Sequence, residues 1–402
     1  VCDRIQASFF ANTTHIVNFI AFDRILVMDN QLLQTPLYQW HVDQGARMVD
    51  FADWSMPVQY QSIVQEHQAT RSAVTMFDVS HMGRIRFDGP GGGELLDRLL
   101  TRSVLDMQLG QVRYSLICNH EGGILDDVLI YHLESPTGVR YFLLVVNASN
   151  RQTIVEWITA QWPDESVVEM QDRTVDTAML AVQGPAALET LQPLFDFDIS
   201  TMKYFRAKVT NQMKKPCILS RTGYTGEDGF ELILKADQSL QVTQNIFAAG
   251  RTHDISPAGL GARDTLRMES AMPLYGHELN EQLNPLEAGL GFAVNFQDQA
   301  GNDRDFIGCQ AIRQTKTDGV QRTRIGIQLE GKRAAREGYA IYCDGHAIGE
   351  VTSGSFSPTL QHPIAMGYVN QLDLPLGSAL EIDVRGKMLP AITCKLPFYK
   401  RT

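Results

Sequence analysis

The 402-residue chain lacks the short signatures of several common cofactor sites. No GxGxxG opens a helix after a strand, and no GxxxxGK followed by Ser or Thr occurs, which argues against a Rossmann or P-loop nucleotide site. The sequence also contains neither the HExxH of zinc proteases nor the GxSxG of serine hydrolases. We therefore expect no metal, flavin or nicotinamide cofactor.

Paired cysteines, long apolar runs and an excess of basic residues are also missing. The six cysteines form no CxxC pair, so a zinc ribbon is not predicted, and their wide spacing fits reduced thiols in a cytosol-like compartment. No apolar run approaches the roughly 20 residues that a bilayer span needs. The formal net charge of −11 argues against nucleic acid as the main partner. We expect neither nucleic acid nor membrane as a partner.

The first residues carry short apolar patches that charged residues such as Asp3 and Arg24 interrupt. They lack the pattern of a secretory signal, and they are too acidic for a mitochondrial presequence. We treat residues 1–34 as an N-terminal extension of doubtful meaning, with Met28 as an alternative start. A bacterial cytoplasmic location is therefore favoured over a mitochondrial matrix.

From Thr35 the chain alternates predicted strands and helices without a strict βαβ rhythm, which indicates an α+β fold with mainly antiparallel sheets. Apolar strands are predicted at 114–120, 124–133 and 141–148, and helices at 149–162 and 261–272. Ser149 or Asn150 is the expected N-cap of the first of these helices.

The domain boundaries follow changes in composition. We expect a folded region of two interleaved α+β lobes at 35–300. The polar stretch 301–320 is taken as a linker zone. After it, short strands separated by DG, GH and RGK turns predict an all-β barrel or sandwich at 321–402.

Two adjacent aspartates, Asp126 and Asp127, begin the otherwise apolar strand of GGILDDVLIYHL. Neighbouring residues of a strand point to opposite faces. If one carboxylate faces the exterior or caps the turn, the other must therefore face the interior. A buried aspartate without a partner is costly, so its presence needs a reason.

A third acid, Glu231, lies within the apolar strand FELIL that follows the glycine-rich loop TGYTGEDG. Glu227 and Asp228 of that loop are expected in solvent. Glu231 has two equally weighted interpretations. It could form an internal salt bridge with an arginine, or it could accept two N–H donors from a planar ligand.

Basic side chains offer fewer candidates. Asp264 and Arg267 are three apart on a predicted helix and can pair, which would leave Arg263 free for an anionic group. A surface helix with ordinary ion pairs is the commoner case. His81 is expected to be a structural histidine with satisfied hydrogen bonds, and the basic run 332–336 to be a solvated loop.

A series of motifs occurs in register between Thr35 and Lys400. They are TPLY, GARMVDFADWSMPVQY, EHQATRSAVTMFDVSHMG, YSL, GGILDDVLIY, VVNASN, VQGP, SRTGYTGEDGFEL, AGLGARDTLRMES, LNPLEAGL, TSGSFSPTL and KLPFYK. Together they resemble the glycine cleavage system T-protein (aminomethyltransferase) family. The resemblance implies a three-lobed, cloverleaf-like fold around a central folate channel, with tetrahydrofolate as co-substrate.

The resemblance also implies a partner and a reaction. Lipoylated H-protein would deliver an aminomethyl group on its dihydrolipoyl sulfur, and other glycine cleavage components would be indirect partners. The products would be ammonia, 5,10-methylenetetrahydrofolate and dihydrolipoyl H-protein.

By resemblance, Asp127 is the catalytic residue. Its carboxylate would stabilise positive charge near the N5–N10 edge of the folate and orient N10. Glu231 would accept the adjacent N3–H and 2-amino donors of the pterin ring. The other positions that match the folate pocket are Arg263, Tyr114, Tyr224, Met82 and Asn147.

Related folds leave alternatives open. A folate-dependent demethylase of a small sulfonium substrate would need no H-protein. Sarcosine and dimethylglycine dehydrogenases carry a flavin domain whose dinucleotide motif is missing here. Iron–sulfur assembly factors carry a Lys-Gly-Cys-Tyr-type motif, which FIGC around Cys309 resembles only superficially. Cys309 and Gln310 stand where Lys-Glu is common in the family.

Overall fold

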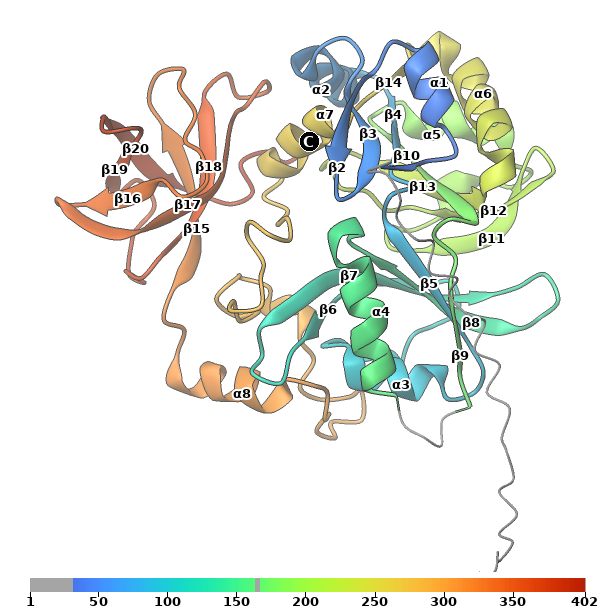
Figure 1. The fold of residues 1–402 in the computed structure, drawn as a ribbon, viewed down its shortest axis with the longest axis horizontal. Helices are drawn as coiled ribbons and strands as arrows, with labels where there is room; N and C mark the ends of the chain where they lie inside the picture. The colour runs from blue at the N-terminus through green and yellow to red at the C-terminus, as the bar shows by residue number, and fades with distance from the viewer. Residues whose placement is uncertain (1–31, 163–166, 402) are drawn as a thin grey trace, which may run out of the picture. The chain divides into compact units, whose positions relative to one another are not determined.

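The computed structural model describes residues 32–162 and 167–401, so most of the predicted extension 1–34 lies outside the described residues. Figure 1 shows the described helices and sheets. The helices are α1 (Tyr38–Asp43), α2 (Ile63–Ser72), α3 (Gly92–Leu99), α4 (Arg151–Ala160), α5 (Ala187–Leu191), α6 (Ser239–Ala249), α7 (Leu260–Glu269) and α8 (Cys309–Asp318). None of the described helices is both long and apolar enough to cross a membrane.

A six-stranded sheet has the strand order β11-β12-β13-β10-β4-β14. Its strands are β4 (Thr75–Asp78), β10 (Thr177–Gln183), β11 (Ala207–Gln212), β12 (Lys215–Ser220), β13 (Gly229–Lys235) and β14 (Ser256–Pro257). The pairings are antiparallel except for β14 with β4. Phe230 of β13 packs with Leu191 of α5 and Ile246 of α6. Helices α5 and α6 therefore cover one face of this sheet (Figure 1).

A five-stranded antiparallel sheet has the order β6-β7-β8-β5-β9. Its strands are β5 (Gly83–Asp88), β6 (Val112–Cys118), β7 (Ile124–Glu134), β8 (Arg140–Val146) and β9 (Glu169–Asp172). Leu96 of α3 and Ile154 of α4 pack on Ile130 of β7. Asn150 holds the predicted N-cap position of α4, but its side chain makes no capping hydrogen bond.

The two sheets and α7 share a second apolar cluster, which we call the shared cluster. Its members include Phe77 and Ile233 of the six-stranded sheet, Tyr131 and Leu133 of the five-stranded sheet, and Ala262 and Leu266 of α7. Side chains alternate along a strand. The face of β7 that carries Tyr131 and the face of β13 that carries Ile233 therefore look toward the same interior.

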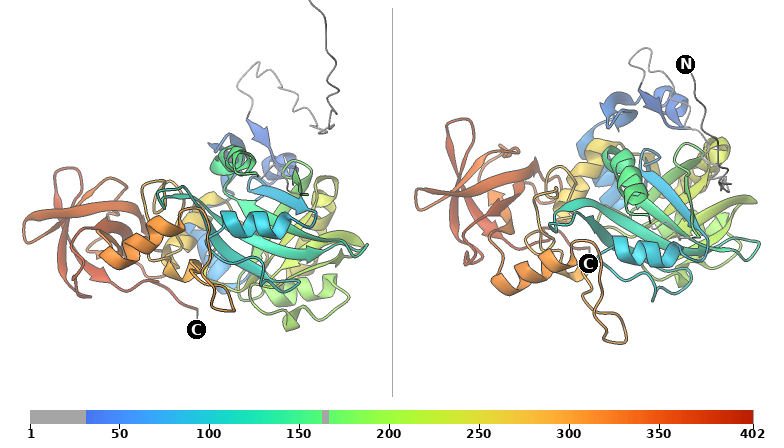
Figure 2. Two further views of the ribbon diagram at one scale, coloured as in Figure 1. Left: turned by 90° about the horizontal axis from the view of Figure 1, so that it is seen from below. Right: turned by 60° about the horizontal axis from the view of Figure 1, so that its bottom comes forward.

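A closed six-stranded barrel and a three-stranded sheet complete the fold. The barrel consists of β15 (Thr323–Leu329), β16 (Ala340–Cys343), β17 (His346–Phe356), β18 (Pro363–Val369), β19 (Ala379–Asp383) and β20 (Met388–Cys394). The small sheet consists of β1 (Leu33–Gln34), β2 (Arg47–Phe51) and β3 (Trp54–Gln59). Figure 2 shows the barrel strands grouped together in both views. The predicted α+β fold with antiparallel sheets and a C-terminal barrel is confirmed.

The zone 301–320, expected as a linker, contains α8. Cys309 and Ile312 of this helix are buried against Cys118 and Ile124 of the five-stranded sheet. The polar residues that suggested a linker occupy mainly the other sides of α8, because a helix buries one stripe and exposes the rest.

A buried ion network ties α2 to α7 and to the C-terminal segment. Arg71 donates to Glu269 at 2.8 Å and to Glu227 at 2.9 Å. Its guanidinium lies 3.9 Å from the ring centroid of Tyr399, whose hydroxyl donates to Glu227. The prediction that Glu227 lies in solvent is therefore wrong. Arg71, 156 positions away, compensates the buried charge of Glu227.

A second network fixes the other side of α7. Arg267 pairs with Asp264 at 2.8 Å, as the three-residue spacing predicts, and with Glu278 at 2.7 Å. Thr352 of the barrel donates to the same Glu278. Helix α7, which carries Arg263, is thus held by charges on two sides.

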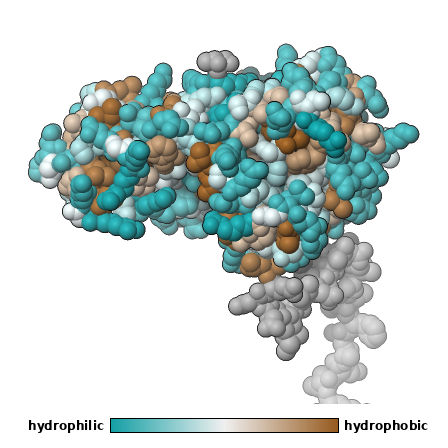
Figure 3. All heavy atoms as spheres, turned by 90° about the horizontal axis from the view of Figure 1, so that it is seen from above, coloured by the Kyte–Doolittle hydropathy of each residue, from teal (hydrophilic) through white to brown (hydrophobic). Residues whose placement is uncertain are grey.

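Exposed apolar residues are dispersed over the surface. On the face in Figure 3, hydrophobic residues are interspersed with hydrophilic ones. Dispersed exposed apolar residues are ordinary for a folded protein. The predicted solvated loop 332–336 is confirmed, since Lys332, Arg333 and Arg336 are all exposed.

Candidate functional site

The two adjacent aspartates lie on β7, which is paired on both sides by β6 and β8. Asp126 is fully buried. Asp127 lies on the opposite face, the one shared with Tyr131, and is partly exposed. Of the two alternatives for the outward carboxylate, exposure to the exterior is wrong and a backbone cap is what the structure shows. Asp126 instead caps the backbone after β8, because the N–H of Asn147 donates to it at 3.0 Å.

Neutral donors hold the Asp127 carboxylate. Asn147 Nδ2 donates to Oδ1 at 2.8 Å, and the Tyr114 hydroxyl donates to Oδ2 at 3.1 Å. Burial raises the pKa of Asp127 above its usual range, although these two hydrogen bonds oppose the rise. The structure thus brings together three of the predicted site residues, and the two side-chain donors that Asp127 has in the described part of the chain are both neutral.

This arrangement predicts that Asp127→Asn stabilises the fold. A raised pKa in the folded state means that the ionised carboxylate costs stability at pH values above that pKa. The asparagine can keep both contacts, since its Oδ1 accepts from Asn147 and its Nδ2 can donate to Tyr114. We expect a gain of roughly 1 kcal/mol, or about 2 °C in melting temperature near neutral pH.

Differential scanning fluorimetry as a function of pH checks this prediction. The gain should shrink as the pH falls through the raised pKa of Asp127, because the wild-type carboxyl is then protonated as well. A variant that melts several degrees below the wild type would contradict it.

Glu231 lies near the middle of β13, on the face that looks toward the shared cluster. Gly229 allows this strand to lie against β10, since a Cβ there would be 2.5 Å from the Val182 carbonyl oxygen. The described side-chain partner of Glu231 is the hydroxyl of Thr222, so the first of the two interpretations, an internal salt bridge with an arginine, is not seen among the described residues. Burial raises the pKa of Glu231. A buried carboxylate with one hydroxyl donor retains capacity for further N–H donors.

Arg263 comes from α7 and approaches this acid without pairing with it. Its Nη1 is buried and has no hydrogen-bond partner within 32–162 and 167–401. Its guanidinium lies 4.6 Å from the ring centroid of Tyr224. Burial lowers the pKa of Arg263, and the charge of Glu231 opposes that shift. The predicted Asp264–Arg267 pair is confirmed, and Arg263 Nη1 has no hydrogen-bond partner among the described residues.

His81 differs from its prediction. It is buried, and its Nδ1 lacks a hydrogen-bond partner among the described residues, so it is not the satisfied structural histidine expected. Burial and the charge of Arg263 lower its pKa to about 3, which keeps the ring neutral. The buried hydroxyl of Tyr131 likewise has no partner in the described chain. Such polar atoms are rare unless a ligand or water completes them.

Tyr224 links the two groups of residues. Its pKa is raised mainly by burial, and it responds to the charges of both Asp127 and Arg263. Met82 packs against the shared cluster beside the same interior. The predicted residues therefore border the interior of the shared cluster, with Arg263 beside Tyr224 and Asp127 on the inner face of β7.

This region can bind a planar ligand that has adjacent N–H donors. Glu231 supplies two acceptor oxygens, and the free Nη1 of Arg263 supplies a donor. Asp127 can then stabilise a positive charge that develops elsewhere on the ligand. Thr222, which donates to Glu231, was not predicted, and the contact of Asn150 with Asp126 was not expected from its predicted N-cap position.

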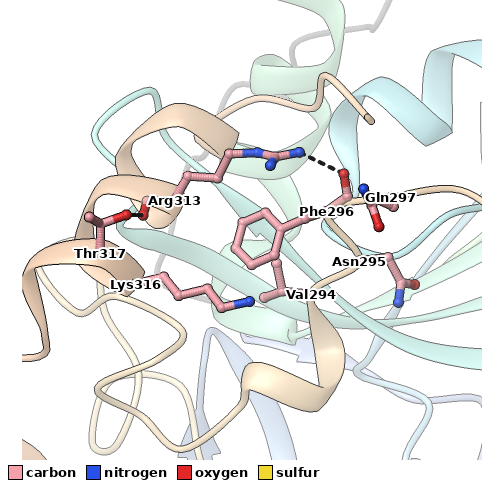
Figure 4. A pocket seen from close by; sticks show the side chains of 7 residues that line it. All are labelled: Val294, Asn295, Phe296, Gln297, Arg313, Lys316 and Thr317. Atoms are coloured by element: carbon pink, nitrogen blue, oxygen red, sulfur yellow. Dashed lines mark hydrogen bonds between the residues drawn. The ribbon is translucent and has the colours of Figure 1, made fainter. Parts of the chain in front are cut away.

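Two surface hollows lie apart from these residues. One, of about 550 Å³, is lined by Val294, Asn295, Phe296, Gln297, Arg313, Lys316 and Thr317 (Figure 4). Arg313 and Lys316 each lie 5.0 Å from the Phe296 ring centroid, and Arg313 is already paired with Asp303. The other, of about 610 Å³, lies around Trp40 and Phe247. Neither contains a predicted site residue.

Comparisons with known proteins cover nearly the whole chain. The family model described as the GCVT N-terminal domain matches residues 37–298, and that of the glycine cleavage T-protein C-terminal barrel domain matches residues 322–400. An aminomethyltransferase of Symbiobacterium thermophilum is 43% identical over 378 residues, which cover 93% of this chain and 99% of that protein. One from Desulforamulus reducens is 44% identical over 371 residues, 92% of this chain and 99% of that protein.

A solved structure agrees with these matches. Aminomethyltransferase T of the glycine cleavage system from Bartonella henselae superimposes with a TM-score of 0.83. It is 30% identical to this chain, and the match covers 92% of this chain and 98% of that structure.

Proposed function

The chain belongs to the glycine cleavage T-protein family of aminomethyltransferases, and we propose that it transfers the methylene of an aminomethyl group from lipoylated H-protein to tetrahydrofolate. The products would be 5,10-methylenetetrahydrofolate, ammonia and dihydrolipoyl H-protein. The proposal includes a location in the bacterial cytoplasm, since the relatives compared above come from bacteria.

One observation carries the choice of tetrahydrofolate. Among the described residues, a buried carboxylate that accepts from one hydroxyl and a buried guanidinium nitrogen without a hydrogen-bond partner face the same interior. The pterin ring has an N3–H and a 2-amino group side by side, which match the two oxygens of Glu231. Arg263 Nη1 and the neutral His81 would bond to other polar atoms of the ring. The residues present therefore fit this co-substrate.

Asp127 would act at the reacting end. When the aminomethyl carbon loses ammonia and bonds to nitrogen, positive charge develops near this carboxylate. A carboxylate already held by two neutral donors can stabilise that charge without reorganising. Its role is electrostatic and orienting, and the hydroxyl of Tyr114 maintains the direction of one oxygen.

The alternative functions make different demands. A folate-dependent demethylase would use the same pterin residues but no H-protein. An iron–sulfur assembly factor would need an accessible cysteine, whereas Cys309 is buried and its thiol donates to the Arg304 carbonyl at 3.4 Å. We therefore retain the demethylase as the competing proposal.

An assay with aminomethyl-loaded H-protein and tetrahydrofolate tests the proposal. We expect release of ammonia and formation of 5,10-methylenetetrahydrofolate in equal amounts, each dependent on both substrates. The matched control replaces loaded H-protein with the unlipoylated form, which should give no product. Demethylation of a sulfonium compound, without product from loaded H-protein, would support the competing function.

A further inference from the structure

The side-chain amide of Asn147 lies between the two aspartates. Its Nδ2 donates one hydrogen to Asp126 Oδ1 and the other to Asp127 Oδ1, each at 2.8 Å. Both hydrogens of the amide are therefore used on carboxylates that belong to opposite faces of β7. Within the described chain, no donor bonds to the Oδ1 of Asn147.

From this geometry we propose that Asp126 is a positioning residue for methylene transfer, which acts on Asp127 through the amide of Asn147. The inference rests on the proposed catalytic role of Asp127. In this proposal Asp126, on the opposite face of β7, fixes the orientation of the Asp127 carboxylate without contacting either substrate.

The oxygen and the nitrogen of a side-chain amide have nearly equal shapes. Packing alone discriminates poorly between the two orientations of an asparagine. If the amide of Asn147 were reversed, its Oδ1 would face Asp127 and repel it. The ionised Asp126 prevents this reversal, because its Oδ1 can then only accept, and the donors of Asn147 lie at the Nδ2 end. The orientation of Asn147 toward Asp127 is thus selected by Asp126.

Asp126 is itself held firmly. It accepts from the backbone N–H of Asn147 at 3.0 Å and from Asn150 Nδ2 at 2.7 Å, in addition to Asn147 Nδ2. Asn150 lies at the N-cap position of α4, so the anchor extends into a helix. The carboxylate is fully buried and cannot turn toward solvent. Because Asp126 Oδ1 accepts from both Asn150 and Asn147, it fixes the Asn147 amide relative to the start of α4.

Asp126 is also a costly anchor. Burial raises its pKa, and the neighbouring charge of Asp127 raises it further. A neutral acceptor could hold the backbone after β8 without placing a second acid beside the first. A neutral side chain such as asparagine, however, would permit either orientation of the Asn147 amide. The need for a strict acceptor explains why an acid stands at this position.

A double-mutant cycle tests the proposal with the full-length chain, loaded H-protein and tetrahydrofolate. We expect Asp126→Asn to lower kcat by about 10- to 100-fold, since a misplaced reacting group costs rate. The KM for tetrahydrofolate should change by less than about threefold. The double variant with Asn147→Ala should fall within about threefold of Asn147→Ala alone, because both changes break the same connection.

The matched control is Asp97→Asn. Asp97 is a structural carboxylate of α3 in the same lobe, where it accepts from the Val104 N–H at 2.6 Å and pairs with Arg304 at 3.1 Å. The Asp97→Asn variant should lower thermal stability. Its effect on kcat and that of Asn147→Ala should be independent. Independent effects of Asp126→Asn and Asn147→Ala on kcat, or an unchanged kcat in Asp126→Asn, would overturn the proposal.

Hydrogen exchange in the wild-type protein tests the same contacts without requiring that the Asp126→Asn variant folds. In asparagine-¹⁵N-labelled protein, both Nδ2 hydrogens of Asn147 should exchange with solvent at least about 100-fold more slowly than those of the exposed Asn302. Exchange as fast as that of Asn302 would overturn the proposal. An active Asp127→Asn variant would instead refute the role of Asp127, so the two failures are distinguishable.

Discussion

Asp127→Asn is expected to lower the single-turnover rate of methylene transfer by about 10³-fold, the upper range for loss of one preorganised electrostatic group. The variant preserves shape and both hydrogen bonds, so the change isolates the charge. Binding of tetrahydrofolate should change little, because the pterin is held by other residues. Rapid quench with loaded H-protein and a parallel titration of folate fluorescence would separate the two effects.

The reason for so large an effect is the placement of the charge. Asp127 lies at the edge of the shared interior, and its described donors, Tyr114 and Asn147, are neutral. Because neither donor is charged, neither neutralises the Asp127 carboxylate, and its negative charge can interact with a cationic transition state. In a partly buried site this interaction is worth more than in water.

Asp172→Asn is the matched control for this variant. Asp172 belongs to β9 of the same sheet and pairs with Arg151 at 2.6 Å, away from the proposed site. Its replacement should affect stability and leave the transfer rate within about threefold of the wild type. Transfer by Asp127→Asn at a rate near that of the wild type would refute the electrostatic role.

Glu231→Gln is expected to weaken tetrahydrofolate binding by about 100-fold, or roughly 3 kcal/mol. Glutamine retains the shape but presents one acceptor and one donor, so one N–H of the pterin would face another N–H. The pterin N–H that loses its acceptor stays buried without a hydrogen bond, which weakens the binding free energy. Equilibrium titration of folate fluorescence measures the affinity, and saturating folate should restore most of the transfer rate.

Glu134→Gln serves as the control for this second variant. Glu134 lies at the end of β7 in an exposed pair with Arg140, so its change should leave folate affinity unaltered. An unchanged affinity in Glu231→Gln would show that its carboxylate has only a structural role. Loss of transfer that saturating folate does not restore would also contradict a pure binding role.

Local patterns were the part of this structure that the sequence revealed best. The alternating strands predicted antiparallel sheets, and the DG and GH turns predicted the C-terminal barrel. The pairing of Asp264 with Arg267 was predictable because both lie on one helix, three residues apart. Each of these features depends on neighbours in the chain, whose geometry follows from helix and strand periods.

The predictions that were wrong concern residues whose partners are distant in the sequence. Glu227 is buried because Arg71 of α2 reaches it, and no pattern around TGEDG indicates that helix. His81 Nδ1 lacks a partner in the described chain, and the charges that act on its ring come from Asp78 of β4, Arg84 of β5 and Arg263 of α7. The alternation rule correctly separated Asp126 from Asp127, but it could not show that both faces of β7 are covered. Tertiary packing decides these cases, and a strand pattern does not contain it.

The central claim is that one folate lies between Glu231 and Asp127, with its pterin at the first and its N5–N10 edge at the second. A crystal structure with a tetrahydrofolate analogue that cannot complete the transfer tests it most directly. We expect the N3–H and 2-amino group within about 3 Å of the Glu231 oxygens, and the N5–N10 edge facing the Asp127 carboxylate. A pterin bound in the hollow around Phe296, or one whose N5–N10 edge points away from Asp127, would contradict the account.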